Sequence, residues 1–471
     1  MTQKVLLVEP DFPYPNKSKN RGNHVHKNFI PIGLLKIGSY YKSLGSKVKL
    51  VRGNQSKKEL RYFKPTLILV TSIFTYWSKY VWDSIKYYRI LFPEAEIVLG
   101  GIYATLHHEK EYFKEDLKKY DVKCHIGLHS KAEEFYPDYS QLNGGVDHHV
   151  THAMRGCIRK CSFCGVWKIE PELSYKTSEE LISEIKTVAK NKVIFFDNNF
   201  LANKHIKQIL SDLTNLKVNG KPIIYECQSG LDGRLLEHDP ELAHLLKMAH
   251  FHNVRIAWDN SLSDYPSIKR QLDYLTEAGY KPQDIFVFMI YNYDIPYEKM
   301  LKKVDCCEKW CVQIADCRYR PLDALKDGYN PGKYRDGQTE DDYYIHTKGG
   351  WTDKKIRNFR KKVRQHNIWI RYAKDKGLEY DKNMEKWSRI HTTFKYFNMG
   401  RPPKLEVIEQ SPTWKRRIEM LNMVRSYYRK NNLNSLDFSV DKMGYIDTAL
   451  RKIISKIEAA RTQSPPVAAG Q

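Results

Sequence analysis

The sequence predicts an α/β protein in three parts: an N-terminal doubly wound parallel sheet, a central partial (β/α)6 barrel of the TIM type, and a mostly helical, basic C-terminal extension. Three observations predict it. Runs rich in Val, Ile and Leu alternate with helix-like segments in the first third of the chain. Strand-like runs then recur every ~30 residues, the length of one βα unit. Positive charge gathers beyond them. The expected domains are 1–145, 146–325 and 326–461, with a disordered tail at 462–471.

Four apolar runs in the first domain have the composition of parallel strands buried on both faces. They begin near Val5, Val48, Leu67 and Ile97. A helix-like stretch from Gly33 separates the first two, and such alternation implies right-handed crossovers. Ligands of doubly wound sheets bind at the carboxyl ends of strands. The sequence places Thr71, Ser72, Gly100 and Gly101 at such ends.

The central domain is expected to contain six strands with a helix between successive strands. One strand leads into Cys157, and the others begin near Val193, Ile223, Val254, Ile285 and Cys311. The helices have clear boundary signals. Residues 177–180 form a capping box, Pro240 suits the first turn of a helix, and Gly279 suits a helix end.

Three closely spaced cysteines give the strongest chemical indication in the chain. Cys157, Cys161 and Cys164 have the spacing C-x3-C-x2-C. Cys thiolates are the usual protein ligands of iron–sulfur clusters, and the usual set is four. Three thiolates on a four-iron cubane would leave one iron for a ligand that is not protein. The alternative is a structural zinc loop with His152 as the fourth ligand.

The triplet, with Phe163 just before its last cysteine, resembles the signature of radical SAM enzymes. The resemblance implies a [4Fe–4S] cluster whose open iron is chelated by the amino and carboxylate groups of S-adenosylmethionine. It implies reductive cleavage of that molecule to a 5′-deoxyadenosyl radical, and a reducing partner such as flavodoxin or ferredoxin.

Polar side chains follow the predicted barrel strands, and the active site of such barrels lies at the strand C-termini. By the resemblance, Asp197 and Asn199 face the methionyl amine or the ribose of S-adenosylmethionine. Gln228 and Arg234 suit the ribose or the carboxylate. Asp259 suits a ribose hydroxyl or the substrate. The chain departs from the family where Asp-Asn-Asn-Phe replaces the usual Gly-Gly-Glu, so other groups must bind the amine.

Four further cysteines lie close together in the sequence. Their pattern allows an auxiliary iron–sulfur site, but buried free cysteines often act as small apolar residues, and core packing is favoured for most. They are Cys306, Cys307, Cys311 and Cys317. Cys317 ends a predicted strand and is the best candidate for a catalytic thiol, as hydrogen-atom donor or substrate contact. Cys227 is the next candidate.

The first domain resembles the cobalamin-binding-like domain that precedes many radical SAM cores. The similar segments are 30–35, 100–105, 132–134 and 137–140. The Asp-x-His-x-x-Gly motif that ligates cobalamin is absent, and His24 and His26 do not have its spacing. Cobalamin therefore stays open as a cofactor, and the alternative is a domain that docks the substrate.

Positive charge is concentrated toward the C-terminus. The chain has a net charge of +23, and residues 346–461 contain 28 Lys and Arg against 12 Asp and Glu. Residues 352–368 predict a helix with one apolar face and cationic remaining faces, which suits phosphate binding. Aromatic side chains that interleave with the charge suit base stacking. These are Trp351, Trp369, Tyr372, Tyr396 and Phe397. A solvated helix with aromatic residues in the core is the alternative.

These features predict a radical SAM enzyme that methylates or otherwise functionalises a nucleic acid, RNA or DNA, or a nucleotide. The alternatives are a peptide or small-metabolite substrate, and a non-catalytic, metal-stabilised nucleic-acid-binding protein. No run of ~18 apolar residues occurs, so no membrane association is expected. Nine cysteines, with a metal-type cluster among them, favour a reducing cytoplasm.

Overall fold

The computed structural model describes residues 2–14, 29–142, 145–332 and 337–376, with isolated positions at 410, 412 and 415. The chain divides into two compact units, Met1–Val363 and Arg364–Gln471. Four residues discussed above lie outside the described part, as does the predicted tail: His24, His26, Tyr396 and Phe397. No helix in the described part combines the length and apolar composition needed to span a bilayer. The predicted domain boundaries stay predictions.

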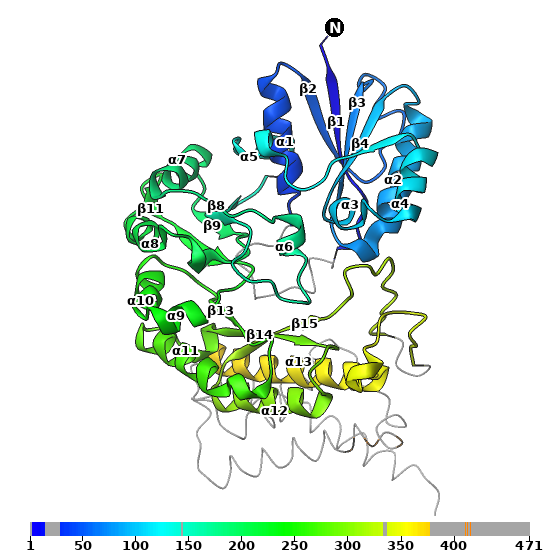
Figure 1. Cartoon of the computed structure of the whole chain (residues 1–471). Helices are drawn as coiled ribbons and strands as arrows, with labels where there is room; N and C mark the ends of the chain where they lie inside the picture. Colours follow the sequence, from blue (N-terminus) through cyan, green and yellow to red (C-terminus); the bar gives the residue numbers. More distant parts are fainter. Residues whose placement is uncertain are drawn as a thin grey trace, which may run out of the picture. The chain divides into compact units, whose positions relative to one another are not determined.

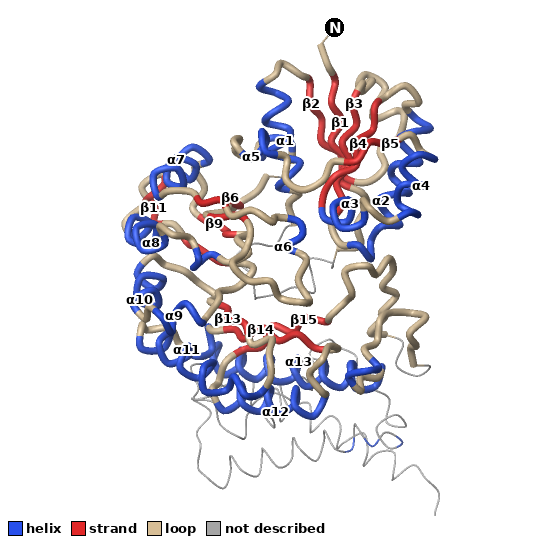
Figure 2. Tube along the Cα trace, viewed as in Figure 1, coloured by secondary structure: helices blue, strands red, loops and turns tan. Residues whose placement is uncertain are grey.

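The N-terminal region is a five-stranded parallel sheet with the order β2-β1-β3-β4-β5 (Figures 1 and 2). Strand order reverses between β1 and β3, as in doubly wound sheets. The strands are β1 (Lys4–Glu9), β2 (Lys47–Arg52), β3 (Leu67–Ser72), β4 (Glu96–Gly101) and β5 (Val122–Cys124). The helices are α1 (Ile32–Ser43), α2 (Ser78–Leu91), α3 (Ile102–His107), α4 (Glu111–Lys119) and α5 (Ser130–Glu133). The expected mixed α/β architecture with a parallel sheet is confirmed.

Both faces of this sheet are buried, which explains the continuous apolar runs. Side chains of successive strand residues point to opposite faces. Val5 belongs to one core cluster with Leu34 of α1, whereas Leu6 belongs to another with Val81 and Ile85 of α2. This kind of sheet occurs in many unrelated cofactor-binding and docking domains. A cobalamin-binding identity therefore stays a prediction.

The carboxyl edge of β3 and β4 is closed by contacts within the chain. The Ser72 hydroxyl donates to the Gly100 carbonyl oxygen at 2.7 Å and accepts from the Ala104 amide at 3.1 Å. Gly101 has a φ of 98°, and a Cβ there would meet the Ser72 carbonyl oxygen at 2.1 Å. Only glycine allows this approach. Ser72 and Gly101 therefore fix the start of α3.

The central region contains six strands in two three-stranded parallel sheets, ordered β12-β9-β6 and β13-β14-β15. The strands are β6 (His149–Thr151), β9 (Lys192–Phe195), β12 (Ile224–Cys227), β13 (Arg255–Ala257), β14 (Phe286–Tyr291) and β15 (Gln313–Arg318). The last five begin within two residues of the expected positions. Short antiparallel pairs are β7 (Met154–Arg155) with β8 (Ser174–Tyr175), and β10 (Lys217–Val218) with β11 (Lys221–Pro222).

The two sheets are joined by isolated bridges, Tyr225 with Phe251 and Leu231 with Ile256, rather than by a continuous ladder. A buried ion pair explains the interruption. The guanidinium of Arg255 bonds to Glu226 and donates to the Cys227 carbonyl oxygen at 3.0 Å. This side chain therefore occupies the place of ladder hydrogen bonds between β12 and β13. One continuous six-stranded barrel sheet is not shown.

Helices surround these strands, and their boundaries follow local chemistry. The capping box at Thr177 and Glu180 is present, and Gly279, with a φ of 92°, follows the end of α11. The helices are α6 (Val166–Ile169), α7 (Ser178–Val188), α8 (Ile206–Thr214), α9 (Arg234–His238), α10 (Glu241–Met248), α11 (Tyr265–Glu277), α12 (Tyr297–Lys309) and α13 (Asp353–Lys376).

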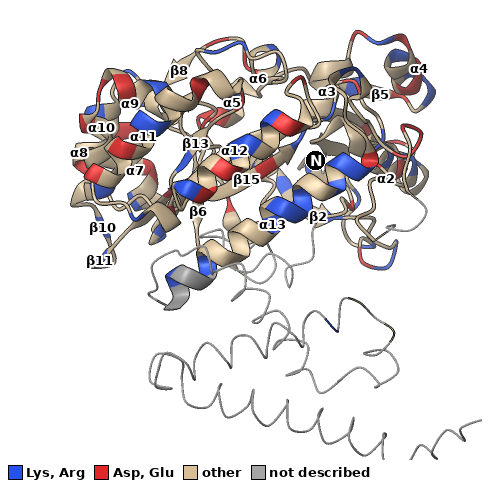
Figure 3. Cartoon of the chain, turned by 90° about the horizontal axis from the view of Figure 1, so that it is seen from below, with Lys and Arg blue, Asp and Glu red and all other residues tan. Residues whose placement is uncertain are grey.

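Up to Val363, α13 has the expected apolar and cationic faces. Ile356, Phe359 and Val363 are buried in the central core, and the Phe359 ring lies 4.9 Å from that of Tyr291 in β14. Figure 3 marks the Lys and Arg positions along this helix in blue. The exposed residues of this stretch include Lys354, Asn358 and Lys361. The helix thus packs against the core by one face and presents positive charge on another.

Candidate functional site

The cysteine triplet lies in the loop between β7 and α6, just beyond β6. Cys157, Cys161 and Cys164 are partly exposed and form no disulfide. Burial raises the pKa of the Cys161 and Cys164 thiols, and the charge of Cys157 raises both further. A positively charged group bound among them would reverse that effect.

Asp197 fixes the backbone that enters this loop. Its carboxylate accepts from the amides of Ala153, at 2.9 Å, and Met154, at 2.6 Å, and the side chain is fully buried. Burial raises the pKa of Asp197 to about 7, although both amide donors act in the opposite direction. We expected Asp197 to face S-adenosylmethionine. The structure instead gives its carboxylate backbone partners beneath the loop.

Glu170 fixes the turn just before Cys157. It accepts from the Gly156 amide at 2.8 Å and from the Asn198 side-chain amide at 3.0 Å, and it pairs with Arg155 at 3.3 Å. Gly156 has a φ of 76°, and a Cβ there would lie 2.6 Å from the carbonyl oxygen of Glu172. The loop thus requires glycine at 156 and a carboxylate at 170, neither of which the sequence analysis singled out.

Two N–H groups point at the Cys157 sulfur. The amide of Arg159 lies 3.4 Å from Sγ, and the side-chain Nδ2 of Asn199 lies 3.8 Å from it. The Oδ1 atom of Asn199 is buried and has no hydrogen-bond partner in the described part of the chain. A buried acceptor in this state is costly, so it indicates a place where a donor from a ligand would bind.

Asp232 contacts several of the polar side chains around the loop. Its carboxylate pairs with Arg159 at 2.8 Å and with Arg234 at 2.7 Å, and it accepts from Asn199 Nδ2 at 3.4 Å. Burial would raise the pKa of Asp232, but the two guanidinium groups lower it. Asp232 was missed as a site residue. The only signal in the sequence was that Asp232 lies two residues before Arg234, which was itself a predicted ligand-binding residue.

The other predicted ligand-binding residues differ in their surroundings. Half of the Arg234 side chain is exposed, and Asp232 already binds its guanidinium. Gln228 is half-buried after β12, and its backbone amide donates to the Phe195 carbonyl oxygen at 2.9 Å. Burial raises the pKa of Asp259 to about 6, and its charge in turn acts on Cys161 and Cys164. Asn199 thus contacts the triplet at Cys157, and Asp232 joins Asn199 to Arg234.

Cys317 lies on the face of β15 opposite to α13. It pairs in register with Ile290, whereas its neighbour Asp316 points to Arg360 of α13, 3.7 Å away. Solvent reaches the thiol, but the surrounding protein atoms and the carboxylates of Asp316 and Asp259 raise its pKa to about 12. A thiol that stays protonated can donate a hydrogen atom but is a poor nucleophile.

The remaining cysteines are mainly structural. Cys307 is fully buried in the core and Cys306 packs against it, as favoured from the sequence. Cys227 is buried, and its thiol donates to the Gly230 carbonyl oxygen at 3.4 Å. Its candidacy as a catalytic thiol is therefore not supported. Cys311 is partly exposed with a φ of 56°.

A single-ion site of the zinc type does not fit the described residues. Among them, no three His, Cys, Asp or Glu side chains converge on one point that could hold a metal ion. The Nε2 atom of His152 already accepts from Arg155 at 3.0 Å, which leaves only its buried Nδ1 without a partner among the described residues. In a cubane each thiolate binds a different iron, so its ligands need not converge. The donor set therefore suits a cluster.

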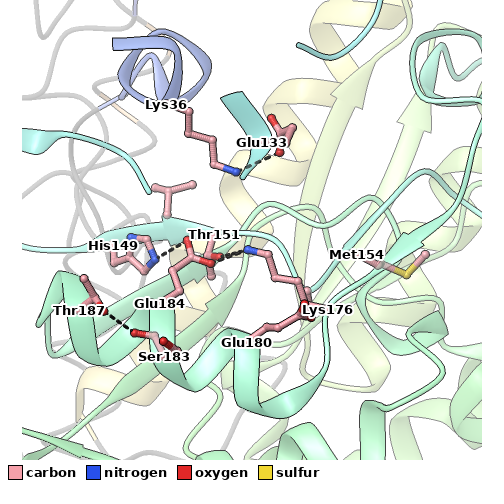
Figure 4. A network of polar contacts seen from close by, with 12 residues as sticks. Lys36, Glu133, His149, Thr151, Met154, Lys176, Glu180, Ser183, Glu184 and Thr187 are labelled. Atoms are coloured by element: carbon pink, nitrogen blue, oxygen red, sulfur yellow. Dashed lines mark hydrogen bonds and ion pairs between the residues drawn. The ribbon is translucent and has the colours of Figure 1, made fainter. Parts of the chain in front are cut away.

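Two groups of ion pairs join the segments around the loop, and Figure 4 shows Lys36 with Glu133 and Glu184 with His149 and Lys176. Glu133 pairs with Lys36 of α1 at 3.0 Å and with Arg155 at 2.7 Å. Beneath β6, Glu184 accepts from His149 Nε2 at 3.1 Å and also bonds Lys176. Burial alone would raise the pKa of Glu184, but these two partners lower it to about 2.

Glu184→Gln should destabilise the fold by about 3 kcal/mol, because it leaves Lys176 without a carboxylate in a mostly buried site. The ordinary pKa, 4.5, is higher than the folded one, so this stabilisation is present above pH 4.5 and lost as the pH falls toward 2. Urea unfolding of the cluster-free chain between these pH values measures the difference. Glu179→Gln, on the exposed side of the same helix, is the control. Equal losses in both variants would contradict the prediction.

Comparison with protein families identifies the central region. Residues 151–301 match the family described as the Radical SAM superfamily. This stretch contains the cysteine triplet, Asn199, Asp232 and Asp259. No curated protein matches the chain. The family match shows a radical SAM domain, and with it an enzyme.

Similarity to solved structures is partial. SuiB of Streptococcus suis bound to S-adenosylmethionine is 14% identical, with 39% of this chain and 42% of that chain covered and a TM-score of 0.27. SuiB bound to the precursor peptide SuiA is 14% identical, with 49% and 56% covered and a TM-score of 0.29. The carboxyl transferase domain of Rhizobium etli pyruvate carboxylase is 12% identical, with 83% and 57% covered and a TM-score of 0.21. The chain spans about half the length of these structures, and at these TM-scores they indicate neither a site nor a substrate.

Proposed function

We propose that this enzyme, whose residues 151–301 form a radical SAM domain, holds a [4Fe–4S] cluster on Cys157, Cys161 and Cys164. The observation that carries the proposal is three partly exposed thiols in one loop whose backbone is anchored by the buried carboxylate of Asp197 and by Glu170. When bound, the cluster and S-adenosylmethionine supply the reductive cleavage that yields a 5′-deoxyadenosyl radical, which takes a hydrogen atom from the substrate.

The residues around the loop have separate roles in this proposal. The Arg159 amide and Asn199 Nδ2 stabilise the Cys157 thiolate by hydrogen bonding to its sulfur. The unpartnered Oδ1 of Asn199 accepts from the amine or ribose of S-adenosylmethionine. Asp259 binds a hydroxyl group of the ribose or of the substrate. Cys317 donates a hydrogen atom to a substrate radical, and one electron from the proposed reductant together with a proton returns its thiyl radical to the thiol.

Gln228 and Arg234 complete the proposed binding site for S-adenosylmethionine. Arg234 binds the carboxylate, and this requires it to share its guanidinium with Asp232. Asp232 then serves to orient Arg234 and Arg159 rather than to contact the ligand. A flavodoxin or ferredoxin as reductant and a cytoplasmic location belong to the same proposal.

The test is anaerobic reconstitution with iron and sulfide, reduction with dithionite, and assay for 5′-deoxyadenosine. The proposal expects this product only when the cluster, reductant and S-adenosylmethionine are all present. A fully loaded and reduced protein that releases none would refute the reaction. Zinc bound in place of iron after purification would favour the metal-stabilised binding protein.

For the substrate, we propose a nucleic acid or nucleotide that is methylated or otherwise functionalised at carbon. The support is positive charge: Lys354 and Lys361 are exposed on α13, and residues 346–461 have 16 more basic than acidic residues. Phosphate groups bind such surfaces with release of counterions. A peptide substrate is equally compatible with the radical SAM domain, and the binding experiment below distinguishes the two kinds of substrate.

Replacing Lys354 and Lys361 together by Glu should weaken RNA binding and lower its salt dependence. Each lost phosphate contact reduces the slope of log K against log salt by about 0.9 for duplexes and about 0.7 for single strands. Fluorescence anisotropy over a salt series measures both quantities. Lys58→Glu, an exposed lysine of the N-terminal region, is the control. Salt-independent binding by the unaltered enzyme would remove the nucleic-acid proposal.

A further inference from the structure

Lys303 of α12 is a buried lysine whose ammonium group binds backbone. Its side chain has no exposed surface. The Nζ atom donates to the carbonyl oxygen of Trp258 at 2.5 Å and to that of Asn260 at 2.9 Å. These two residues flank Asp259. Burying an ammonium group is costly unless it is hydrogen-bonded, and here its bonds are to the loop that carries a candidate ligand-binding carboxylate.

Further contacts fix the backbone of the loop at Trp258–Asn260. The Trp258 side chain is buried, its indole N–H donates to the Ser261 carbonyl oxygen at 3.0 Å, and its ring lies 4.8 Å from the Lys303 Nζ. The Trp258 amide donates to the Phe288 carbonyl oxygen at 2.9 Å, which extends the pairing of β13 with β14. With Trp258 fixed on one side and Asn260 on the other, the backbone leaves Asp259 little freedom of direction.

The strand beside this loop gives the direction of the Asp259 side chain. Its carboxylate is hydrogen-bonded by the backbone of Ile290 in β14. Ile290 pairs in register with Cys317 of β15, the candidate hydrogen-atom donor. Asp259 therefore lies at the end of the sheet that carries Cys317.

We propose that Lys303 is a positioning residue for Asp259: by binding the carbonyl groups on both sides, it fixes the backbone that carries the Asp259 carboxylate. The inference rests on the proposed function, in which Asp259 binds a hydroxyl group of S-adenosylmethionine or of the substrate. Lys303 itself touches neither. Its influence passes through the backbone of Trp258–Asn260.

The first test needs no cluster. In Lys303→Met, hydrogen exchange of the Trp258 amide should be about tenfold faster, because local opening becomes easier once the two bonds are gone. Lys302→Met, the neighbouring exposed lysine of the same helix, should leave the rate unchanged. Lys303→Gln, which can still donate to one carbonyl group, should be intermediate and guards against loss of folding in the Met variant. An unchanged rate in folded Lys303→Met would overturn the proposal.

The second test measures coupling in the reconstituted protein. The dissociation constant for S-adenosylmethionine should rise about tenfold in Lys303→Met and in Asp259→Asn, as for other residues that orient a ligand-binding group. The double variant should bind no more weakly than Asp259→Asn alone. If the double variant instead showed the product of the two single increases in dissociation constant, Lys303 would act independently of Asp259, and this would overturn the proposal. Faster exchange with unchanged affinity in Asp259→Asn would keep the positioning role and refute only the binding of S-adenosylmethionine by Asp259.

Discussion

Replacing any one of Cys157, Cys161 and Cys164 by Ala should abolish assembly of the cluster. A [4Fe–4S] cluster usually has four thiolate ligands, so a site with three has none to spare. We expect iron content to fall from about four per chain to near zero, and 5′-deoxyadenosine to fall below detection. Iron and sulfide analysis after anaerobic reconstitution, together with the visible absorption spectrum, measures the loss.

The controls for this result are other cysteines of the chain. Cys306→Ala removes a cysteine that packs against the core, and Cys317→Ala removes the candidate hydrogen-atom donor. Both variants should keep their iron, and Cys317→Ala should still cleave S-adenosylmethionine. Full iron retention in Cys161→Ala would contradict the assignment of the triplet.

Asp197→Ala should destabilise the central region by about 2–4 kcal/mol. The variant leaves the buried amides of Ala153 and Met154 without an acceptor, and each such group costs about 1–3 kcal/mol. Because these amides begin the cysteine loop, cluster loading should fall as well. Urea unfolding of the cluster-free chain and iron content after reconstitution measure the two effects.

Asp197→Asn separates geometry from charge. Its amide oxygen can still accept from both backbone amides, so it should lose less stability than Asp197→Ala. The native carboxyl group has a pKa of about 7 in the fold against an ordinary 3.8, so its contribution to stability is largest below pH 3.8 and is lost as the pH rises to 7. The Asn variant should lack this pH dependence. Asp323→Ala, at an exposed position, is the control, and an equal loss there would contradict the anchoring role.

The strands and helices were predictable because their signals are local. Val193 lies in a buried apolar run, and Thr177 caps a helix through a residue three positions away. The interruption between the two central sheets was not predictable. It depends on the buried pair of Glu226 and Arg255, which are 29 residues apart in sequence.

The candidate site was predictable only in its cysteines and in the residues that follow the strands. Successive side chains of a strand point to opposite faces of the sheet, and the exact position of the strand end decides which way Asp197 points. The sequence alone therefore did not tell whether Asp197 faces a ligand or the loop backbone. Asp232 meets Arg159 across 73 residues, and Lys303 meets Trp258 across 45. Neither contact has a local signature. The residues that hold the site in place therefore emerged only from the structure.

The electron paramagnetic resonance spectrum of the reduced cluster, with and without S-adenosylmethionine, tests the central claim most directly. Three cysteine ligands leave one iron open, so addition of S-adenosylmethionine should change the spectrum. The change should be smaller in a variant at Asn199, whose Oδ1 has no partner among the residues that the structure describes. A fully loaded, reduced cluster with a spectrum that S-adenosylmethionine does not change would contradict the account.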